Sequence, residues 1–109
     1  MNITNLLLKF FGEIFGTFIF IILILIITQK ETRSYVVAVP IGLALAISII
    51  IFGEFTGGHF NPAVTFTFFI KDPKVFTALM ASVYITAQII GAYLALEINT
   101  YINSKYLKI

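Results

Sequence analysis

The chain has 109 residues, of which 60% are hydrophobic and only 11% are charged, and its mean hydropathy is +1.04. Soluble domains carry roughly 25% charged residues, so this composition lies far outside the soluble range and predicts an integral membrane protein. The absence of cysteine excludes disulfides, thiolate metal sites and cysteine nucleophiles, and a net charge of +2 is too sparse for a nucleic-acid-binding face.

The first apolar segment, residues 10–27, is long enough to cross a membrane as a helix with modest tilt. Glu13, Gly16 and Thr17 lie three and four residues apart, which places them on one helical face. Gly12 and Gly16 form a pattern of small residues that lets another helix approach closely. We therefore expect the Glu13 carboxyl to point into protein. We favour a structural role, as acceptor of backbone hydrogen bonds, over a direct functional role.

A second predicted spanning helix covers residues 36–53, which carry no charge. Pro40 falls in or near its first turn, where proline is tolerated. Gly42, Ala44 and Ala46 are small residues, and we expect them to mark the side of this helix that packs against protein.

Residues 55–65 place polar and turn-forming residues inside otherwise apolar sequence. Gly57 and Gly58 permit backbone conformations that are closed to residues with a Cβ atom. The chain is therefore predicted to run irregularly there, with its carbonyls turned sideways. Asn61 is a favoured N-cap residue and Pro62 suits the first helical position, so a helix is predicted to begin here.

The helix that begins at Pro62 is predicted to end at Ile70, before a charged turn. Its nine residues, at about 1.5 Å each, give roughly 13 Å, under half of a hydrocarbon core about 30 Å thick. We therefore predict a re-entrant element over residues 55–70, which aims its positive N-terminal end at the bilayer centre. The alternative is an ordinary loop and an amphipathic helix of a soluble protein, which the composition disfavours.

The third predicted spanning helix covers residues 75–96, which are uncharged. Ala87, Gly91 and Ala95 repeat at four-residue spacing, which is typical of a helix-packing face. Gln88 shares a face with Gly91, so we expect its amide to face protein rather than lipid.

The predicted fold is an all-α membrane protein with three transmembrane helices and one re-entrant half-helix, in one domain over residues 1–109. Residues 97–109 are expected to form a polar tail. His59 and Glu54 are the only ionisable pair near mid-chain, and no third ligand accompanies them, so we predict no metal site.

A bracing or pore-edge role for His59 is favoured over proton transfer. We predict no cofactor and no enzyme activity, because the alternative of an intramembrane enzyme would need a nucleophile or a metal pair at mid-depth.

Three motifs in order resemble those of a known channel family. Residues 56–65, with the triplet Asn61-Pro62-Ala63, are similar to the first signature loop of the aquaporin and glycerol-facilitator family, the major intrinsic proteins. Residues 13–17 resemble that family's first-helix Glu-x-x-Gly-Thr, and residues 87–92 resemble its third-helix Ala-Gln-x-x-Gly-Ala. The resemblance covers nearly the whole chain.

The resemblance implies that four carbonyls line a pore, those of Gly57, Gly58, His59 and Phe60. It also implies that the Asn61 amide donates hydrogen bonds to water at the pore midpoint. Near a positive half-helix end, such a water relays protons poorly and a cation meets repulsion. Ile41 falls at an outer-constriction position that is usually aromatic in strict water channels. The resemblance therefore leaves room for small neutral solutes such as glycerol.

Members of that family have two such halves arranged as an inverted repeat, and this sequence contains the first half. One half-helix leaves the other half of the bilayer unlined, so one copy cannot make a selective pore. Three possibilities stay open: two copies in opposite orientation, a separate chain that supplies the second half, or a truncated product. We favour the truncated product over antiparallel pairing.

The distribution of positive charge does not decide between these possibilities. With the N-terminus inside, as in the family, the inner cations are Lys9, Lys71 and Lys74. The outer ones are Lys30, Arg33, Lys105 and Lys108. The cytoplasmic side therefore has no excess. Insertion in both orientations requires a near-equal number of positive charges on the two sides. A truncated product can show the same near-equality by chance.

We predict a half-length channel module in a multi-pass protein of the plasma membrane. It would conduct water or small neutral solutes passively, as part of a larger assembly. The expected partners are membrane lipid, the solute, and a second copy or a complementary half-channel, with no nucleic acid. The alternative is a truncated, non-conducting fragment that only associates with other helices.

Overall fold

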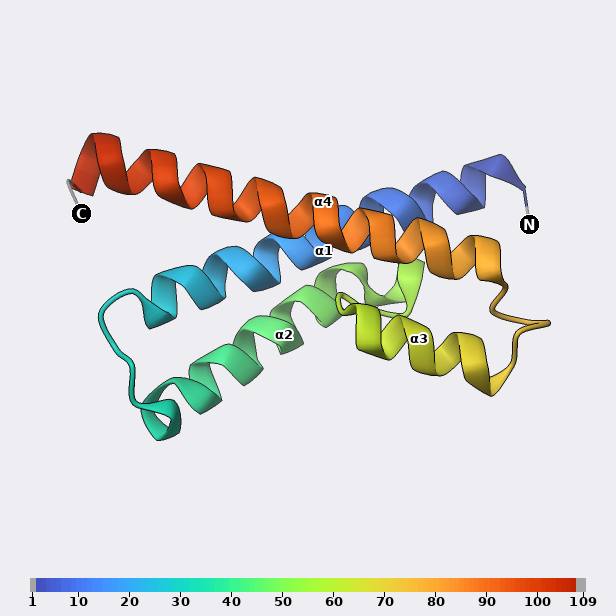
Figure 1. Cartoon of the computed structure of the whole chain (residues 1–109), viewed down its shortest axis with the longest axis horizontal. Coiled ribbons are helices and arrows are strands. Elements are labelled where there is room, and N and C mark those ends of the chain that lie inside the picture. The colour runs from blue at the N-terminus through green and yellow to red at the C-terminus, as the bar shows by residue number, and fades with distance from the viewer. Residues whose placement is uncertain (1, 108–109) are drawn as a thin grey trace.

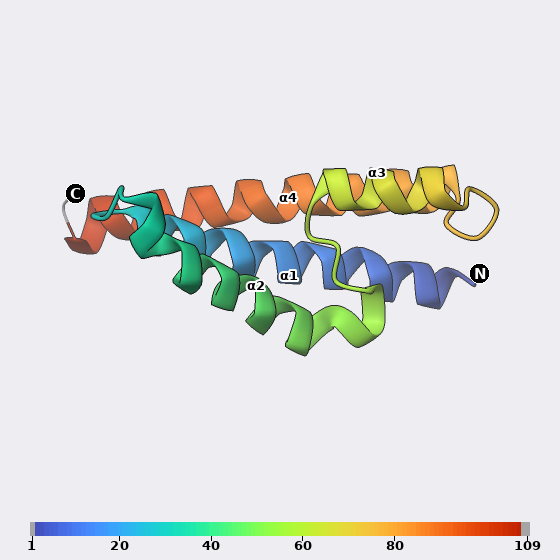
Figure 2. The same ribbon diagram turned by 90° about the horizontal axis from the view of Figure 1, so that it is seen from below.

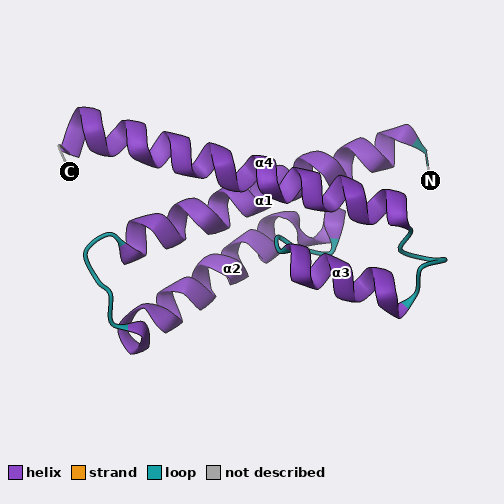
Figure 3. Ribbon diagram, viewed as in Figure 1, coloured by secondary structure: helices purple, strands orange, loops and turns teal. Residues whose placement is uncertain are grey.

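The computed structural model describes residues 2–107, and this part of the chain consists of helices and their connections (Figure 3). In chain order the helices are α1 (Ile3–Thr28), α2 (Ser34–Thr56), α3 (Pro62–Lys71) and α4 (Ala78–Ile102). A single π-helical turn, η1 (Asn103–Leu107), continues α4.

Three of the helices, α1, α2 and α4, are long and apolar enough to cross a membrane. The remaining helix, α3, is apolar but has only 10 residues. At about 1.5 Å per residue it is about 15 Å long, half of a hydrocarbon core about 30 Å thick. The predicted set of three long helices and one half-length helix is confirmed.

The bundle is built around α1, because both α2 and α4 pack along it. α4 crosses α1, and α3 lies beside the N-terminal half of α4 (Figure 1). In Figure 2 the loop after α2 runs back toward the middle of the bundle, and α3 then returns to the end where α2 stopped. The segment therefore enters and leaves on the same side, as a re-entrant element does.

The helix ends follow local chemistry. Three helices begin at a residue whose side chain accepts a hydrogen bond from a backbone amide in the first turn, namely Asn2, Asn61 and Thr77. α2 ends where Gly57 adopts a left-handed conformation and donates its amide to the Gly53 carbonyl at 2.7 Å. At the same end, the Lys9 ammonium donates to the Phe55 carbonyl at 3.2 Å.

Several predicted bounds were wrong. α1 begins at Ile3 rather than at residue 10, because Asn2 caps it there. α4 begins at Ala78 rather than at Val75, because the Asp72 carbonyl accepts the amides of Val75 and Phe76 and holds them in a turn.

The polar tail expected over residues 97–109 is helical through Leu107. Its last turn is supported where the Lys105 ammonium donates to the Tyr101 hydroxyl at 3.0 Å. Lys108, which entered the charge comparison, lies outside the described residues.

The predicted packing side of α2 was also wrong at Gly42. Nothing lies within 4 Å of the position that a Cβ atom on Gly42 would take, and Ala46 is only half-buried. The buried face passes instead through Ala44 and Ser48, which are 2% and 0% exposed. Residues two positions apart do not share a helical face, whereas residues four apart do.

Glycines allow the closest contacts of the bundle. A Cβ atom on Gly91 would overlap the Ile14 carbonyl of α1, and one on Gly16 would overlap the Phe60 ring. The backbones of α1 and α4 therefore approach directly, as small-residue packing faces permit.

Candidate functional site

The loop that joins α2 to α3 has an unusual backbone. Gly57 and Gly58 have φ of +87° and +68°, and Phe60, which is not glycine, has φ of +52°. Glycine adopts such angles without steric cost, whereas another residue there costs roughly 1–3 kcal/mol. The surrounding structure must therefore hold Phe60 in place.

The side chain that holds the loop is Glu13 on α1, which is 0% exposed. One carboxyl oxygen accepts the His59 amide at 3.1 Å, and the other accepts the Phe60 amide at 2.8 Å. Buried amides need such partners, since an unmet donor costs about 1–3 kcal/mol. This arrangement is the one that a structural acceptor requires.

A second layer of hydrogen bonds connects Glu13 to α3 and α4. The Gln88 side-chain amide donates to Glu13 Oε2 at 2.9 Å and to Thr65 Oγ1 at 2.8 Å. Thr65 Oγ1 also lies 2.9 Å from His59 Nδ1. All four side chains are buried, so one network joins α1, the loop, α3 and α4.

The His59 ring lies in an aromatic cluster. Its centroid is 4.9 Å from that of Phe68, 5.2 Å from that of Phe76 and 4.9 Å from that of Tyr84. The Tyr84 hydroxyl donates to the Thr56 carbonyl at 2.6 Å, where α2 ends. These contacts place His59 in a bracing position. Within residues 2–107, no group of three or more His, Cys, Asp or Glu side chains could hold a metal ion.

The loop carbonyls and the tip of α3 differ from these buried side chains. In the described part of the chain, no hydrogen bond ends on the carbonyls of residues 57–60. Asn61, Pro62 and Ala63 are exposed. The Asn61 side-chain oxygen accepts the Ala63 amide at 2.8 Å, which leaves the NH₂ group of Asn61 as a donor. The loop and the tip of α3 therefore have four carbonyls without a partner among the described residues and one oriented amide donor.

The structure brings together the predicted loop residues, Glu13 and Gln88. Ile41 is not part of this cluster: it is half-buried in the second turn of α2, at the end of that helix away from the loop. Thr65 and Tyr84 also belong to the cluster, and neither was predicted as a site residue. The sequence signal that could have identified them is that each is a polar side chain inside an otherwise apolar helix.

Comparisons with known proteins find the same family that the sequence motifs resemble. The sequence profile described as "Major intrinsic protein" matches residues 1–108. The chain is similar to Aquaglyceroporin-2 of Rhizophagus irregularis, with 44% identity over 55 residues, which are 50% of this chain and 16% of the relative. It is also similar to an aquaglyceroporin of Toxoplasma gondii (strain ATCC 50611 / Me49), with 39% identity over 61 residues, 56% of this chain and 23% of the relative. The matches thus cover less than a quarter of either relative. No solved structure matches the chain significantly.

Proposed function

Because the chain belongs to the major intrinsic protein family, we propose that it forms one half of a channel that passes water or small neutral solutes such as glycerol. The observation that carries the proposal is the braced loop. Glu13 holds the amides of His59 and Phe60, while the carbonyls of residues 57–60 keep no partner in the described part of the chain. Such carbonyls can accept hydrogen bonds from a passing hydroxyl or water.

The same geometry favours neutral solutes over ions. The Asn61 NH₂ group can donate to an oxygen of the solute at the tip of α3. The N-terminal end of α3 carries the positive end of the helix dipole, which disfavours a cation. Ile41 is apolar and not aromatic, so the outer wall would not restrict passage to water. The names of the two relatives, which are aquaglyceroporins, support this range of solutes.

The proposed channel needs a second half. α3 reaches only about half of the bilayer, and its tip is exposed. Beside Pro62 lies a cavity of about 140 Å³ whose walls include Thr17 and Gln88. Thr17 Oγ1 and Gln88 Oε1 are buried without a partner among the described residues. A second copy in opposite orientation, or a separate complementary chain, would cover this region. The proposed location is the plasma membrane.

The alternative proposal is a non-conducting fragment that only associates with other helices.

Stopped-flow shrinkage of liposomes that contain the purified chain separates the two proposals. A channel raises water or glycerol permeability above that of empty liposomes, and Asn61→Asp lowers it, because a carboxylate replaces the oriented donor. Gly42→Ala serves as the control, since that position is open. Permeability equal to empty liposomes, unchanged by Asn61→Asp, supports the non-conducting fragment.

A second experiment identifies the complementary half. The chain has no cysteine, so Ala63→Cys adds a single thiol at the tip of α3. If two copies pair in opposite orientation, their tips meet and oxidation in the membrane gives a disulfide-linked dimer. A tag at the C-terminus would then be found on both sides of the membrane. One orientation in every molecule excludes the self-paired channel and leaves either a separate complementary chain or the non-conducting alternative.

A further inference from the structure

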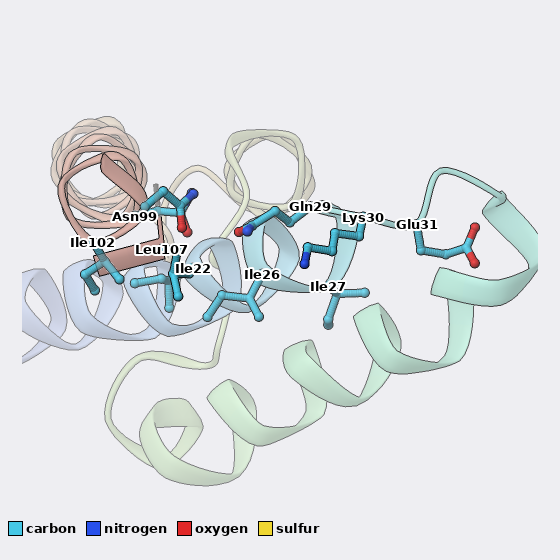
Figure 4. Close-up of a pocket in the computed structure, with 10 residues that line it drawn as sticks. Ile22, Ile26, Ile27, Gln29, Lys30, Glu31, Asn99, Ile102 and Leu107 are labelled. Carbon is cyan, nitrogen blue, oxygen red and sulfur yellow. The ribbon is translucent and has the colours of Figure 1, made fainter. Parts of the chain in front are cut away.

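A second cavity, of about 560 Å³, lies between the C-terminal ends of α1 and α4, far along both helices from the α3 site. Figure 4 shows the side chains that line it. Its walls are aliphatic and include Ile22, Ile26 and Ile102. Its rim is polar, with Gln29, Lys30, Glu31, Asn99 and Asn103.

The polar rim lies where the apolar segments end. α1 ends at Thr28, and Gln29 and Lys30 follow it directly. On α4 the uncharged run ends at Leu96, before Asn99 and Asn103. The rim is therefore expected at the level of the lipid headgroups, while the isoleucines below it lie in the hydrocarbon region.

Lys30 supplies a cation that the described residues do not neutralise. Glu31 also lines the rim, but its carboxylate is bound by Arg33, which donates from Nε to Oε2 at 2.9 Å and from Nη2 to Oε1 at 2.5 Å. In Figure 4 the Glu31 carboxylate points away from the cavity. No hydrogen bond or ion pair of Lys30 is found within residues 2–107. The side-chain amides at the rim are likewise available as donors.

We propose that this cavity binds one phospholipid, with its phosphate at Lys30 and the rim amides and an acyl chain against the isoleucines. A free phosphate would leave the aliphatic walls uncovered, so the lipid is the better match. An anionic headgroup is preferred, because phosphatidylcholine would bring a second cation close to Lys30. Each lysine or arginine near an anionic lipid surface contributes about 1 kcal/mol to the free energy of binding. The proposal stands independently of channel activity.

The test uses the purified chain in detergent, to which phosphatidylglycerol or phosphatidylcholine is added. Native mass spectrometry then gives the fraction of chain that retains one lipid. We expect the wild type to prefer phosphatidylglycerol, and Lys30→Gln to weaken its retention about fivefold. The matched control is Lys105→Gln, which also removes one positive charge at this end of the bundle. Lys105 does not line the cavity, and its ammonium donates to the Tyr101 hydroxyl. This control should retain lipid like the wild type. Helical circular dichroism verifies that each variant is folded.

Four results would overturn the proposal. The first is equal retention of both lipids by the wild type, and the second is an equal loss in Lys30→Gln and Lys105→Gln. The third is displacement of the lipid by millimolar inorganic phosphate, which would assign the rim to a free anion. A dimer that forms as lipid is removed, and that Lys30→Gln weakens, would assign the cavity to a second copy and also reject the lipid.

Discussion

The middle of the bundle and its far end, away from α3, differ in how the chain fills them. In the middle, beside the loop, the buried residues of α1 all fall between Gly12 and Thr17, and they contact the loop and α4. At the far end, residues 18–28 of α1 include no fully buried residue, and an aliphatic cavity opens between α1 and α4. Irregular backbone is stable inside a membrane only when its polar groups have partners. The buried polar residues are therefore concentrated beside the loop, whose backbone groups need partners.

The largest effect is expected from removing the residue that braces the loop. Glu13→Ala leaves the amides of His59 and Phe60 and the Gln88 side chain without their acceptor. At about 1–3 kcal/mol for each unmet group, the free energy of unfolding should fall by about 3 kcal/mol or more. Unfolding in sodium dodecyl sulfate, followed by helical circular dichroism, measures it.

Glu13→Gln is the matched variant, because it keeps one carbonyl oxygen and places an NH₂ group where an acceptor was. Its free energy of unfolding should lie between that of Glu13→Ala and that of the wild type. If both variants unfold like the wild type, the carboxyl does not brace the loop, and the contrast between the middle of the bundle and its far end fails.

A smaller effect is expected at the close contact between α1 and α4. A Cβ atom in Gly91→Ala would overlap the Ile14 backbone, and overpacking of this kind costs typically 1–3 kcal/mol. Gly42→Ala adds the same methyl group in open space, so its change should stay within about 0.5 kcal/mol. The same unfolding assay compares them. Equal losses in the two variants would contradict the packing of α1 against α4.

A modest loss is expected when one hydrogen bond of the loop cluster is removed. Tyr84→Phe keeps the ring beside His59 and removes the hydroxyl that donates to the Thr56 carbonyl at 2.6 Å. One such bond contributes about 1 kcal/mol, so unfolding should become easier by about that amount. Tyr93→Phe, at an exposed residue of the same helix, provides the control. A loss in both variants alike would show that the effect does not come from the loop.

The smallest effect is expected at the far end, in the connection between α1 and α2. Hydrogen bonds from Arg33 lower the pKa of Glu31 from 4.5 to about 2. Since the folded pKa is depressed, the contact is fully present above pH 4.5 and is lost as the pH falls through about 2. Both side chains face water, so the pair should leave global unfolding nearly unchanged. The carboxyl ¹³C shift of Glu31 should titrate near pH 2, and Arg33→Gln should return the midpoint toward 4.5. A wild-type midpoint near 4.5 would contradict the pair.

Local sequence patterns were sufficient to predict most of the helices. The N-cap at Asn61, the proline at Pro62 and a short apolar run predicted the start and length of α3, because these signals act within one or two helical turns. Helical spacing alone placed Glu13 and Gln88 on faces that point into protein. The side of α2 that packs could not be obtained in this way, since Gly42 is small but has no neighbour.

The polar cluster could be predicted only in part, because its contacts join distant parts of the chain. Gln88 reaches Glu13 across 75 positions and Thr65 across 23, and Tyr84 reaches the Thr56 carbonyl across 28. Sequence spacing within one helix says nothing about such pairs. They follow from how α1, α3 and α4 pack, which only the structure provides.

The proposed half-channel requires that α3 carries its tip to the middle of the bilayer and returns to one surface. A fluorophore attached to Ala63→Cys or to Lys71→Cys, in a chain without other cysteines, reports depth through quenching by doxyl lipids. The label at position 63 should be quenched most by a doxyl group near the end of the acyl chain. The label at position 71 should be quenched most by one near the headgroup. Strongest quenching of both labels near the headgroup would contradict the re-entrant element and the half-channel built on it.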